Sequence, residues 1–423
     1  MAKSHASYWL ESETIRPFLK EFTDKLRLPG EVLDVGCGPG RDVIALTQKG
    51  IETVGVDNSS AMIAEARNRY PDAIFRRMDM RRLGFPSALF SGIWCCASLQ
   101  HIPCSEALST LREWARVLRY DGVMGVSIER GSGAKAKYDH LGRFVQTYSI
   151  EQLRNIVIEA GFDIMAITPS QTFKTCSGEG QERNWIHLIA RKTVASDVAG
   201  SDEPQDMGCQ FCPESRFKYN RRFEMLSAAS VLWSDADVYV IPDIAQVTDG
   251  HLLIASTRHR SCYGACTDKE RDSLHFVRDR IRLIFREVYG TSTLFFEHGS
   301  HAPNKAGCCI DHAHLHCIPV ELCLRGTLDQ KLGEGTAADI ETLKALYARN
   351  QSYLYVQDPD GVERYWPVDI LPRQYLRQIS ISLLGHTEWR WQDICSLETN
   401  RALYQKITKR LAPEFDRYFY NVQ

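Results

Sequence analysis

The spacing of hydrophobic residues along the first half of the chain predicts alternating helices and strands. An amphipathic helix is predicted over residues 12–27 by the helical recurrence of Ile15, Phe18, Leu19, Phe22 and Leu26. The apolar run VLDVG then predicts a buried strand, and after GCGPG a helical pattern runs to Gly50. Later apolar runs predict a second strand in ETVGVD, a third before RRMDM, a fourth in FSGIWCCASLQHI and a fifth in DGVMGVSI. This order predicts an α/β domain.

The second half has longer polar connections and a different pattern. DVYVIP, HLLIAS and TLFFEHGS predict strands, and DKERDSLHFVRDRIRLIFREVYG predicts a long amphipathic helix. IDHAHLHCIPV alternates between polar and apolar residues, which is typical of a strand. Such a strand points His312, His314 and His316 toward one face.

Length and composition divide the chain and narrow its class. A chain of 423 residues predicts two or three domains, and the Ser-, Asp- and Gly-rich segment TVASDVAGSDEPQDMG predicts a linker. We therefore predict a domain over residues 1–192, a linker over 193–207 and a second domain over 208–423. A net charge of −2 gives no basic field for nucleic acid, and no apolar run of about 18 residues predicts a membrane span. The N-terminus shows no signal-peptide pattern, and 14 scattered cysteines favour a reducing, cytoplasmic location.

The first glycine turn has the setting of a nucleotide-binding loop. Strand, turn and helix follow in order around Gly36, Gly38 and Gly40, so a ligand can approach the backbone and the free N–H groups of the helix. Asp57 ends the second strand, where a carboxylate can accept hydrogen bonds from both hydroxyls of a ribose. His101 follows the fourth strand and is either a catalytic base or a loop residue.

Residues 8–192 resemble class I S-adenosylmethionine-dependent methyltransferases through DVGCGPG, GVD and RVLRYDG at their spacings. The resemblance implies a seven-stranded doubly wound, Rossmann-like sheet, a small-molecule methyl acceptor and the cofactor S-adenosylmethionine. The residues it implies around the cofactor are Asp34 near the amino group, Gly36, Cys37, Gly38 and Gly40 along the methionine part, Asp57 and Asn58 at the ribose, Asp79 and Met80 at the adenine, and Ala97 and Ser98 at the sulfonium. The alternative is a Rossmann domain that binds a nicotinamide cofactor, although the glycine spacing differs from that fingerprint.

The histidine segment admits three interpretations. It can be the polar face of an edge strand, a zinc site built from all three rings, or a nucleophilic histidine with its supports. Upstream, Cys209 and Cys212 have the C-x-x-C spacing that forms one edge of a tetrahedral zinc site. A redox pair is the competing interpretation, but no thioredoxin-like pattern surrounds it.

The H-x-H-x-H run resembles the histidine triad (HIT) superfamily, and CQFC with GHLLIAS resembles its zinc-bearing branch, which includes galactose-phosphate uridylyltransferases. The resemblance implies an α+β domain with an antiparallel sheet, in which His314 attacks the α-phosphate of a nucleotide. His316 would contact the phosphate and His251 would orient the cluster. The zinc ligands it implies are Cys209, Cys212, His259 and His312.

Four other residues of the second half each have two interpretations. Asn304 is either a phosphate contact or a turn residue, and Arg373, Gln374 and Arg377 either recognise an anionic substrate or form a solvated helix face. NKAGCC replaces the glycine-rich segment usual before the triad.

Together these features predict a bifunctional enzyme that transfers methyl groups and hydrolyses or transfers a nucleotidyl group. The alternative is an active methyltransferase whose HIT-like domain serves as a nucleotide-binding or regulatory module. The resemblance also implies a homodimer formed through the HIT domain.

Overall fold

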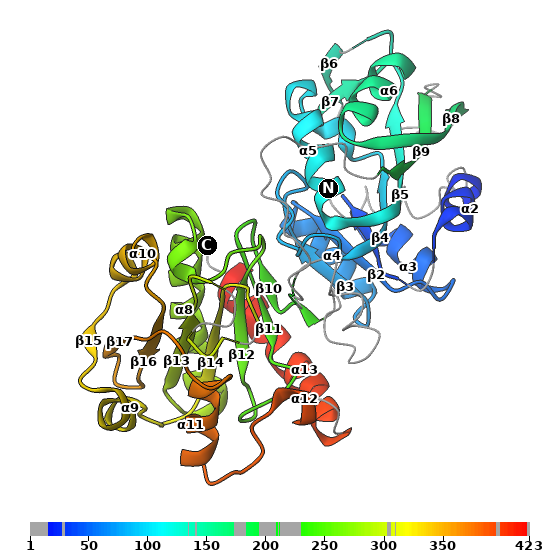
Figure 1. Cartoon of the computed structure of the whole chain (residues 1–423). Helices are drawn as coiled ribbons and strands as arrows, with labels where there is room; N and C mark the ends of the chain where they lie inside the picture. Colours follow the sequence, from blue (N-terminus) through cyan, green and yellow to red (C-terminus); the bar gives the residue numbers. More distant parts are fainter. Residues whose placement is uncertain are drawn as a thin grey trace. The chain divides into compact units, whose positions relative to one another are not determined.

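The computed structural model describes residues 16–27, 30–133, 135–139, 142–172, 183–193, 209, 211, 230–302, 306–308, 310–394 and 398–420. The chain divides into two compact units, residues 1–83 with 87–202 and residues 84–86 with 203–423 (Figure 1). The division falls between residues 202 and 203, inside the predicted linker. Apart from Thr193 that linker lies outside the described residues, so its bounds stay a prediction.

The first unit is built on a seven-stranded sheet with the order β3-β2-β1-β4-β5-β9-β8. Its strands are β1 (Val32–Val35), β2 (Thr53–Asp57), β3 (Ile74–Arg77), β4 (Phe90–Cys96), β5 (Leu118–Glu129), β8 (Phe162–Thr172) and β9 (Arg183–Lys192). The first five run parallel, whereas β9 pairs antiparallel with both β5 and β8. The predicted doubly wound sheet is therefore confirmed as a mixed sheet.

Helices flank most of these strands, as the hydrophobic spacing predicts. In chain order, α2 (Arg16–Lys25) precedes β1, α3 (Arg41–Thr47) connects β1 to β2, and α4 (Ser60–Arg69) connects β2 to β3. The short 3-10 turn η1 (Leu99–His101) and α5 (Cys104–Val117) connect β4 to β5, and α6 (Ile150–Glu159) precedes β8. A two-stranded hairpin, β6 (Lys135–Tyr138) and β7 (Phe144–Thr147), stands apart from the sheet. Phe22 of α2 packs on Trp94 of β4 with ring centroids 5.2 Å apart, which closes one part of the core.

The second unit is built on an eight-stranded sheet with the order β10-β11-β12-β14-β13-β16-β17-β15, in which every pair is antiparallel. Its strands are β10 (Trp233–Ser234), β11 (Val238–Pro242), β12 (Leu252–Ser256), β13 (Thr293–Gly299), β14 (His314–Pro319), β15 (Thr336–Ala337), β16 (Tyr353–Gln357) and β17 (Glu363–Pro367). Its helical segments are η3 (Tyr263–Ala265), α8 (Asp268–Tyr289), α9 (Arg325–Leu332), α10 (Ile340–Ala348), α11 (Tyr375–Leu383), α12 (Trp391–Ile394) and α13 (Glu398–Tyr420).

Two hydrophobic layers cover the two faces of this sheet. Residues of α8 and α13 pack with Leu315 and Cys317 of β14 in one layer. Residues of α9 and α11 pack with Ile318 of the same strand in the other layer. Because side chains alternate along a strand, His314 and His316 share the face of Ile318 and thus of α11.

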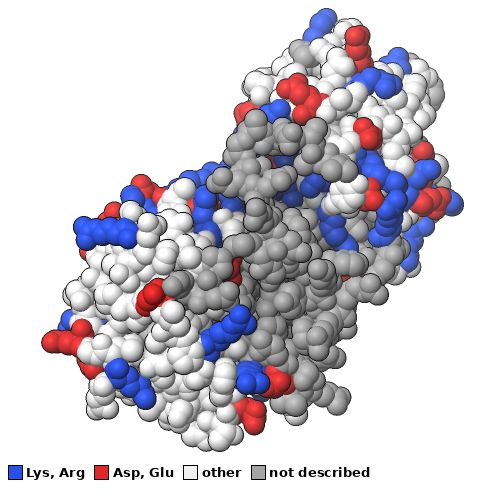
Figure 2. Space-filling view, viewed as in Figure 1, with Lys and Arg blue, Asp and Glu red and all other residues white. Residues whose placement is uncertain are grey.

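The long helix α8 illustrates how much of this local structure follows from the sequence. Thr267 caps its first turn in a capping box with Glu270, and Gly290 ends it in the left-handed conformation. Within the described part of the chain, no helix has the length and apolarity required to cross a membrane. On the visible surface, basic and acidic side chains are interspersed (Figure 2).

Candidate functional sites

The glycine turn of the first unit lies between β1 and α3. Gly36, Gly38 and Gly40 all have positive φ, at 71°, 53° and 91°. A Cβ on Gly36 would lie 2.3 Å from the Cβ of Ser98, so the turn at this position requires glycine. Ser98 donates a hydrogen bond from its hydroxyl to the carbonyl oxygen of Gly36 at 2.9 Å. Ser98, predicted at the sulfonium, and Gly36, predicted along the methionine part, are thus in direct contact.

Asp57 holds the turn from the end of β2. Its Oδ2 accepts from the backbone N–H of Gly38 at 3.0 Å, and its Oδ1 accepts from the N–H of Ser59 at 2.8 Å. These two bonds orient the carboxylate and leave one lone pair on each oxygen for further donors. Burial raises the pKa of Asp57, and the two backbone hydrogen bonds oppose that shift.

Asp34 is a buried carboxylate on β1 that lacks a full set of partners. Its Oδ2 has no hydrogen-bond partner among the described residues, and the side chain is buried. Burial first, and then the nearby charge of Asp42, raise the pKa of Asp34 well above its ordinary value. An unsatisfied buried acceptor is costly, so this atom favours a cationic or hydrogen-bond-donating ligand.

The remaining residues predicted to bind the cofactor differ in their distance from the turn, their burial and their partners. Met80 reaches the turn, because its Cε would lie 3.4 Å from a Cβ on Gly36. Asp79 binds the guanidinium of Arg81 at 2.6 Å, and this pairing outweighs burial and lowers the pKa of Asp79. Cys37 is buried, and Asn58, directly after the end of β2, is exposed. Ala97 has φ 58°, which marks a sharp change of direction after β4.

A buried ion pair beside Asp34 was missed by the sequence reasoning. Arg41 and Asp42 of α3 form two hydrogen bonds of 2.6 and 2.8 Å, and the indole N–H of Trp94 donates to Asp42 at 2.9 Å. Adjacent Arg and Asp residues on a helix carry no sequence signal for this arrangement, since the partner on β4 is 52 residues away.

The histidines of the second unit separate into two groups. The strand β14 begins at His314, so the expectation that all three rings lie on one strand is wrong for His312. His312 lies in a bend before the strand, where its Nε2 is 2.8 Å from the carbonyl oxygen of Ser256. The two ring nitrogens of His312 therefore face Ser256 and Cys209.

His251 and His316 form a hydrogen-bonded pair. The backbone N–H of Val247 donates to Nδ1 of His251 at 3.3 Å, so the proton of a neutral His251 ring lies on Nε2. That Nε2–H faces Nδ1 of His316 at 2.9 Å, which leaves the proton of His316 on its Nε2. Burial lowers the pKa of His251 to about 4 and that of His316 well below its ordinary value, so both rings are neutral at pH 7.

His314 has the opposite arrangement of protons. Its Nδ1 lies 2.5 Å from the carbonyl oxygen of His312, and because a carbonyl only accepts, Nδ1 carries the hydrogen. A neutral ring then has its lone pair on Nε2, and no hydrogen bond to that atom is recorded among the described residues. The His314 and His316 rings are adjacent, with centroids 5.1 Å apart in an edge-on arrangement.

Asp243, which the sequence reasoning missed, and the guanidinium of Arg377 support the pair. Oδ2 of Asp243 lies 3.5 Å from Nε2 of His251 and 3.7 Å from Nδ1 of His316. Nη1 of Arg377 on α11 lies 3.4 Å from the same oxygen, and Arg377 also binds the carbonyl oxygens of Ala245 and Trp389. The alternative that Arg377 lies on a solvated helix face is wrong, because the side chain is buried. Recognition of an anionic substrate by Arg377 stays a prediction.

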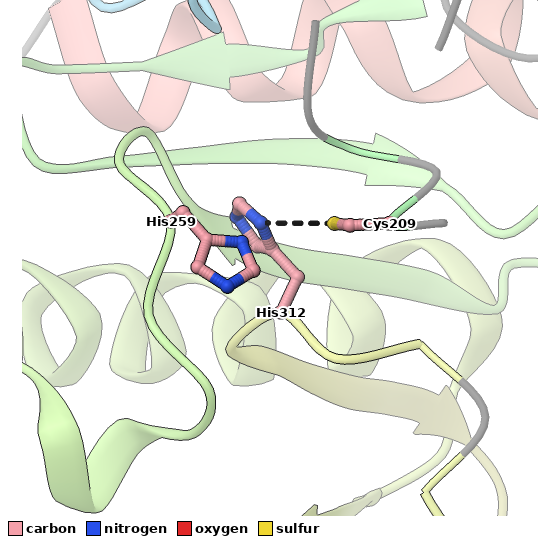
Figure 3. Close-up of side chains that lie close together, drawn as sticks. All are labelled: Cys209, His259 and His312. Atoms are coloured by element: carbon pink, nitrogen blue, oxygen red, sulfur yellow. Dashed lines mark hydrogen bonds between the residues drawn. The ribbon is translucent and has the colours of Figure 1, made fainter. Parts of the chain in front are cut away.

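A second group gathers donors that suit a metal ion. One donor atom each of Cys209, His259 and His312 lies within 4.8 Å of the others, and Figure 3 shows the three side chains facing one another. Sγ of Cys209 is 3.6 Å from Nδ1 of His312. Zn–S and Zn–N bonds of about 2.3 and 2.0 Å place two tetrahedral donors roughly 3.5 Å apart, so the spacing suits zinc. The hydrogen bond from Nε2 of His312 to Ser256 leaves Nδ1 as the ligand atom.

Several predicted residues do not enter this description. Cys212 and Asn304 lie outside the described residues, as does Cys309 of the NKAGCC segment. Arg373 is exposed, and Gln374 is buried at the start of α11 with φ 61°.

Two family matches cover separate parts of the chain. Residues 32–122 match the family described as "Methyltransferase domain", and residues 207–329 match the family described as "Protein similar to CwfJ C-terminal". The first match contains the glycine turn and the second contains the histidines.

Individual relatives align with the first unit. The chain is 31% identical over 132 residues to the 27-O-demethylrifamycin SV methyltransferase of Amycolatopsis mediterranei, covering 28% of this chain and 48% of the relative. It is 34% identical over 122 residues to the demethylmenaquinone methyltransferase of Beutenbergia cavernae, covering 28% and 50%. The chain therefore spans about half the length of these curated relatives.

Among solved structures, the 1,6-didemethyltoxoflavin-N1-methyltransferase of Burkholderia thailandensis is 21% identical to this chain with a TM-score of 0.39, covering 45% of this chain and 83% of that chain. The sequence matches are to methyltransferases, and the strand order β3-β2-β1-β4-β5-β9-β8 is consistent with the predicted class I methyltransferase sheet. The first unit contains a class I S-adenosylmethionine-dependent methyltransferase domain.

Proposed function

We propose that the first unit transfers a methyl group from S-adenosylmethionine to a small-molecule acceptor. The buried, unsatisfied Oδ2 of Asp34 suits the ammonium group of the cofactor, and Asp57 has free lone pairs for the ribose hydroxyls. A Cβ on Gly38 would meet nothing within 4 Å, so the turn is open at this position to the methionine part of the cofactor. When bound, this cofactor supplies an electrophilic methyl group on a sulfonium, and the protein supplies position and exclusion of water.

Calorimetric titration with S-adenosylhomocysteine tests this proposal without knowledge of the acceptor. The full-length protein is expected to bind one equivalent, and Asp57→Ala is expected to weaken binding at least tenfold. Asp24→Ala, on the exposed side of α2, is the matched control and should bind as the wild type does. Absence of binding to the wild-type protein would exclude the cofactor.

We further propose that the second unit is a HIT-type nucleotidyl hydrolase or transferase. The observation that carries this proposal is the unprotonated Nε2 of His314 next to the protonated Nε2 of His316. The lone pair of His314 would attack the α-phosphorus of a nucleotide, so that an N–P bond forms and the bond to the leaving group breaks with its electron pair. The N–H of His316 would donate to a phosphate oxygen. Water or a second acceptor would then take the nucleotidyl group.

Intact-protein mass spectrometry tests the covalent step. The full-length protein is incubated with the 5′-phosphoramidates of adenosine, guanosine, cytidine and uridine and is quenched in alkali, which preserves phosphohistidine. A mass increase of one nucleotidyl group is expected, and it should disappear in His314→Ala but persist in His386→Ala, an exposed histidine. An adduct that survives in His314→Ala would exclude this nucleophile.

We also propose that the Cys209, His259 and His312 group, completed by Cys212, binds zinc. The donor set and the spacing of 3.6 Å between Cys209 and His312 support a closed structural site. Such a site would hold the bend before β14 in place and thereby fix the carbonyl oxygen that orients His314.

A second candidate for this unit is a nucleotide-binding or regulatory module without catalysis. It is favoured by the segment before the triad, where the carbonyl oxygen of Gly307 accepts a hydrogen bond from the backbone N–H of Gln374 at 2.8 Å. A Cβ on Gly307 would lie 2.6 Å from the carbonyl oxygen of Pro372, so this loop is packed against the start of α11. Nucleotide binding with no adduct and no turnover in the experiment above would support this candidate.

A further inference from the structure

His101 lies beside the proposed cofactor turn, although neither family match assigns it a role. It ends η1, which directly follows Ala97 and Ser98. The backbone N–H of His101 donates to the carbonyl oxygen of Ser98 at 3.0 Å, and Ser98 in turn binds Gly36. A short chain of hydrogen bonds therefore connects His101 to the glycine turn.

A carbonyl oxygen of the β6–β7 hairpin sets the tautomer of this histidine. Nδ1 of His101 lies 2.6 Å from the carbonyl oxygen of Phe144, the first residue of β7. Because a carbonyl oxygen only accepts, the hydrogen of a neutral ring lies on Nδ1 and Nε2 holds a lone pair. Among the described residues, no hydrogen bond to Nε2 is recorded.

The charged groups around His101 come from two sides. Asp57 at the end of β2 interacts electrostatically with His101. The imidazole therefore lies near the carboxylate that is proposed to bind the ribose of the cofactor. Arg143 and Asp139, in the connection between β6 and β7, form an ion pair 2.7 Å long that also acts on the ring. Burial is the largest effect and lowers the pKa of His101, so the ring is neutral and can accept a proton at pH 7.

We propose that His101 is the catalytic base of methyl transfer and that the acceptor is a hydroxyl or N–H compound that must lose a proton. This inference rests on the proposed methyltransferase function. The acceptor's oxygen or nitrogen forms a bond to the methyl carbon, and the methyl–sulfur bond breaks with its electron pair left on sulfur. The acceptor's proton moves to Nε2 of His101 and later leaves to solvent. A tertiary amine or thioether, which has no such proton, would need no base.

The tautomer can be measured without any acceptor. Nitrogen NMR of the full-length protein labelled at histidine, saturated with S-adenosylhomocysteine, is expected to show a neutral, Nδ1-protonated His101 at pH 7.5. The signal is assigned by its loss in His101→Gln. An Nε2-protonated or doubly protonated ring would overturn the inference. Failure of the wild type to bind S-adenosylhomocysteine would instead count against the proposed function, so the two failures are distinguishable.

Methyl transfer to simple probes tests the role in catalysis. Phenol and 4-nitrophenol are compared at pH 8, where only 4-nitrophenol is largely ionised. His101→Gln is expected to slow transfer to phenol by about 10²- to 10⁴-fold and to slow transfer to 4-nitrophenol much less, with unchanged affinity for S-adenosylhomocysteine. His187→Gln, a histidine of the same unit that contacts Ser170 and Phe18, is the control. Equal losses of transfer rate to the two phenols in His101→Gln would overturn the proposal. So would a wild-type protein that methylates pyridine, an acceptor with no proton to lose, but neither phenol.

Discussion

Arg377 and Asp243 form a buried ion pair that connects α11 to the histidine pair of the second unit. Their closest atoms are 3.4 Å apart, and the residues are 134 positions apart in the chain. The same carboxylate oxygen faces both His251 and His316. Because α11 follows the segment matched by the second family, residues outside that match complete the candidate site.

Removal of the guanidinium should therefore disturb both stability and the site. Arg377→Met leaves the Asp243 carboxylate buried without its cation, and we expect the free energy of unfolding to fall by about 3 to 5 kcal/mol. Urea denaturation of the full-length protein measures this change. The double variant Arg377→Met/Asp243→Asn should recover part of the loss, since it removes the uncompensated charge. A double variant no more stable than Arg377→Met would contradict the ion-pair explanation.

Glu297 should make the stability of the second unit depend on pH. It is buried on β13 and accepts hydrogen bonds from the backbone N–H of Tyr263 and the hydroxyl of Tyr353, at 2.7 and 2.9 Å. Burial nevertheless raises the pKa of Glu297 from 4.5 to about 7. The folded state therefore binds the proton more tightly than the unfolded state. The resulting stabilisation is fully present below pH 4.5 and is lost as the pH rises through about 7.

Glu297→Gln should remove this dependence. Relative to the wild type, the variant is expected to gain about 2 kcal/mol of stability between pH 5 and pH 8, as measured by urea denaturation at both values. Glu388→Gln, at an exposed position, serves as the control and should show no such change. A constant difference between Glu297→Gln and the wild type across this range would show that Glu297 does not titrate there.

Gly36 and Gly50 allow backbone strain to be separated from a steric clash at the cofactor turn. Both have positive φ, at 71° and 77°, but a Cβ on Gly50 meets nothing within 4 Å. In each alanine variant, the strain of a positive φ should lower the free energy of unfolding by about 1 to 2 kcal/mol. Only Gly36→Ala adds the clash with Ser98, so it should also weaken S-adenosylhomocysteine binding at least tenfold in calorimetry. Equal effects of the two variants on binding would contradict the proposed position of the cofactor.

The proposed zinc site predicts a bound metal in the purified protein. Mass spectrometric metal analysis should find about one zinc per chain, and Cys209→Ser should lower this content by more than half. Cys323→Ser, at an exposed cysteine, is the matched control. Chelation of the metal should lower the melting temperature by roughly 5 °C or more, because the bound ion stabilises only the folded state. Full zinc content in Cys209→Ser would exclude Cys209 as a ligand.

The sequence by itself determined the features that depend on neighbouring residues. The apolar run before Gly36, the glycines of the turn and the amphipathic spacing of α8 are patterns of residues a few positions apart, so they predicted β1, the turn and α8 correctly. Asp57 was likewise predicted at the end of β2, because the strand's length and apolar run are local properties.

Only the tertiary structure decided which distant side chains meet. The alternating histidines predicted one common face, but the ladder begins at the pairing of His314 with Ala255, and His312 turns instead toward Cys209. The proton positions on His314 and His101 depend on carbonyl oxygens that the fold brings to them. Likewise, Arg377 meets Asp243 only because α11 packs on the face that carries the histidines. Periodicity specifies the side of an element on which a residue lies, whereas strand register and helix packing, set by contacts far apart in the chain, specify its partner.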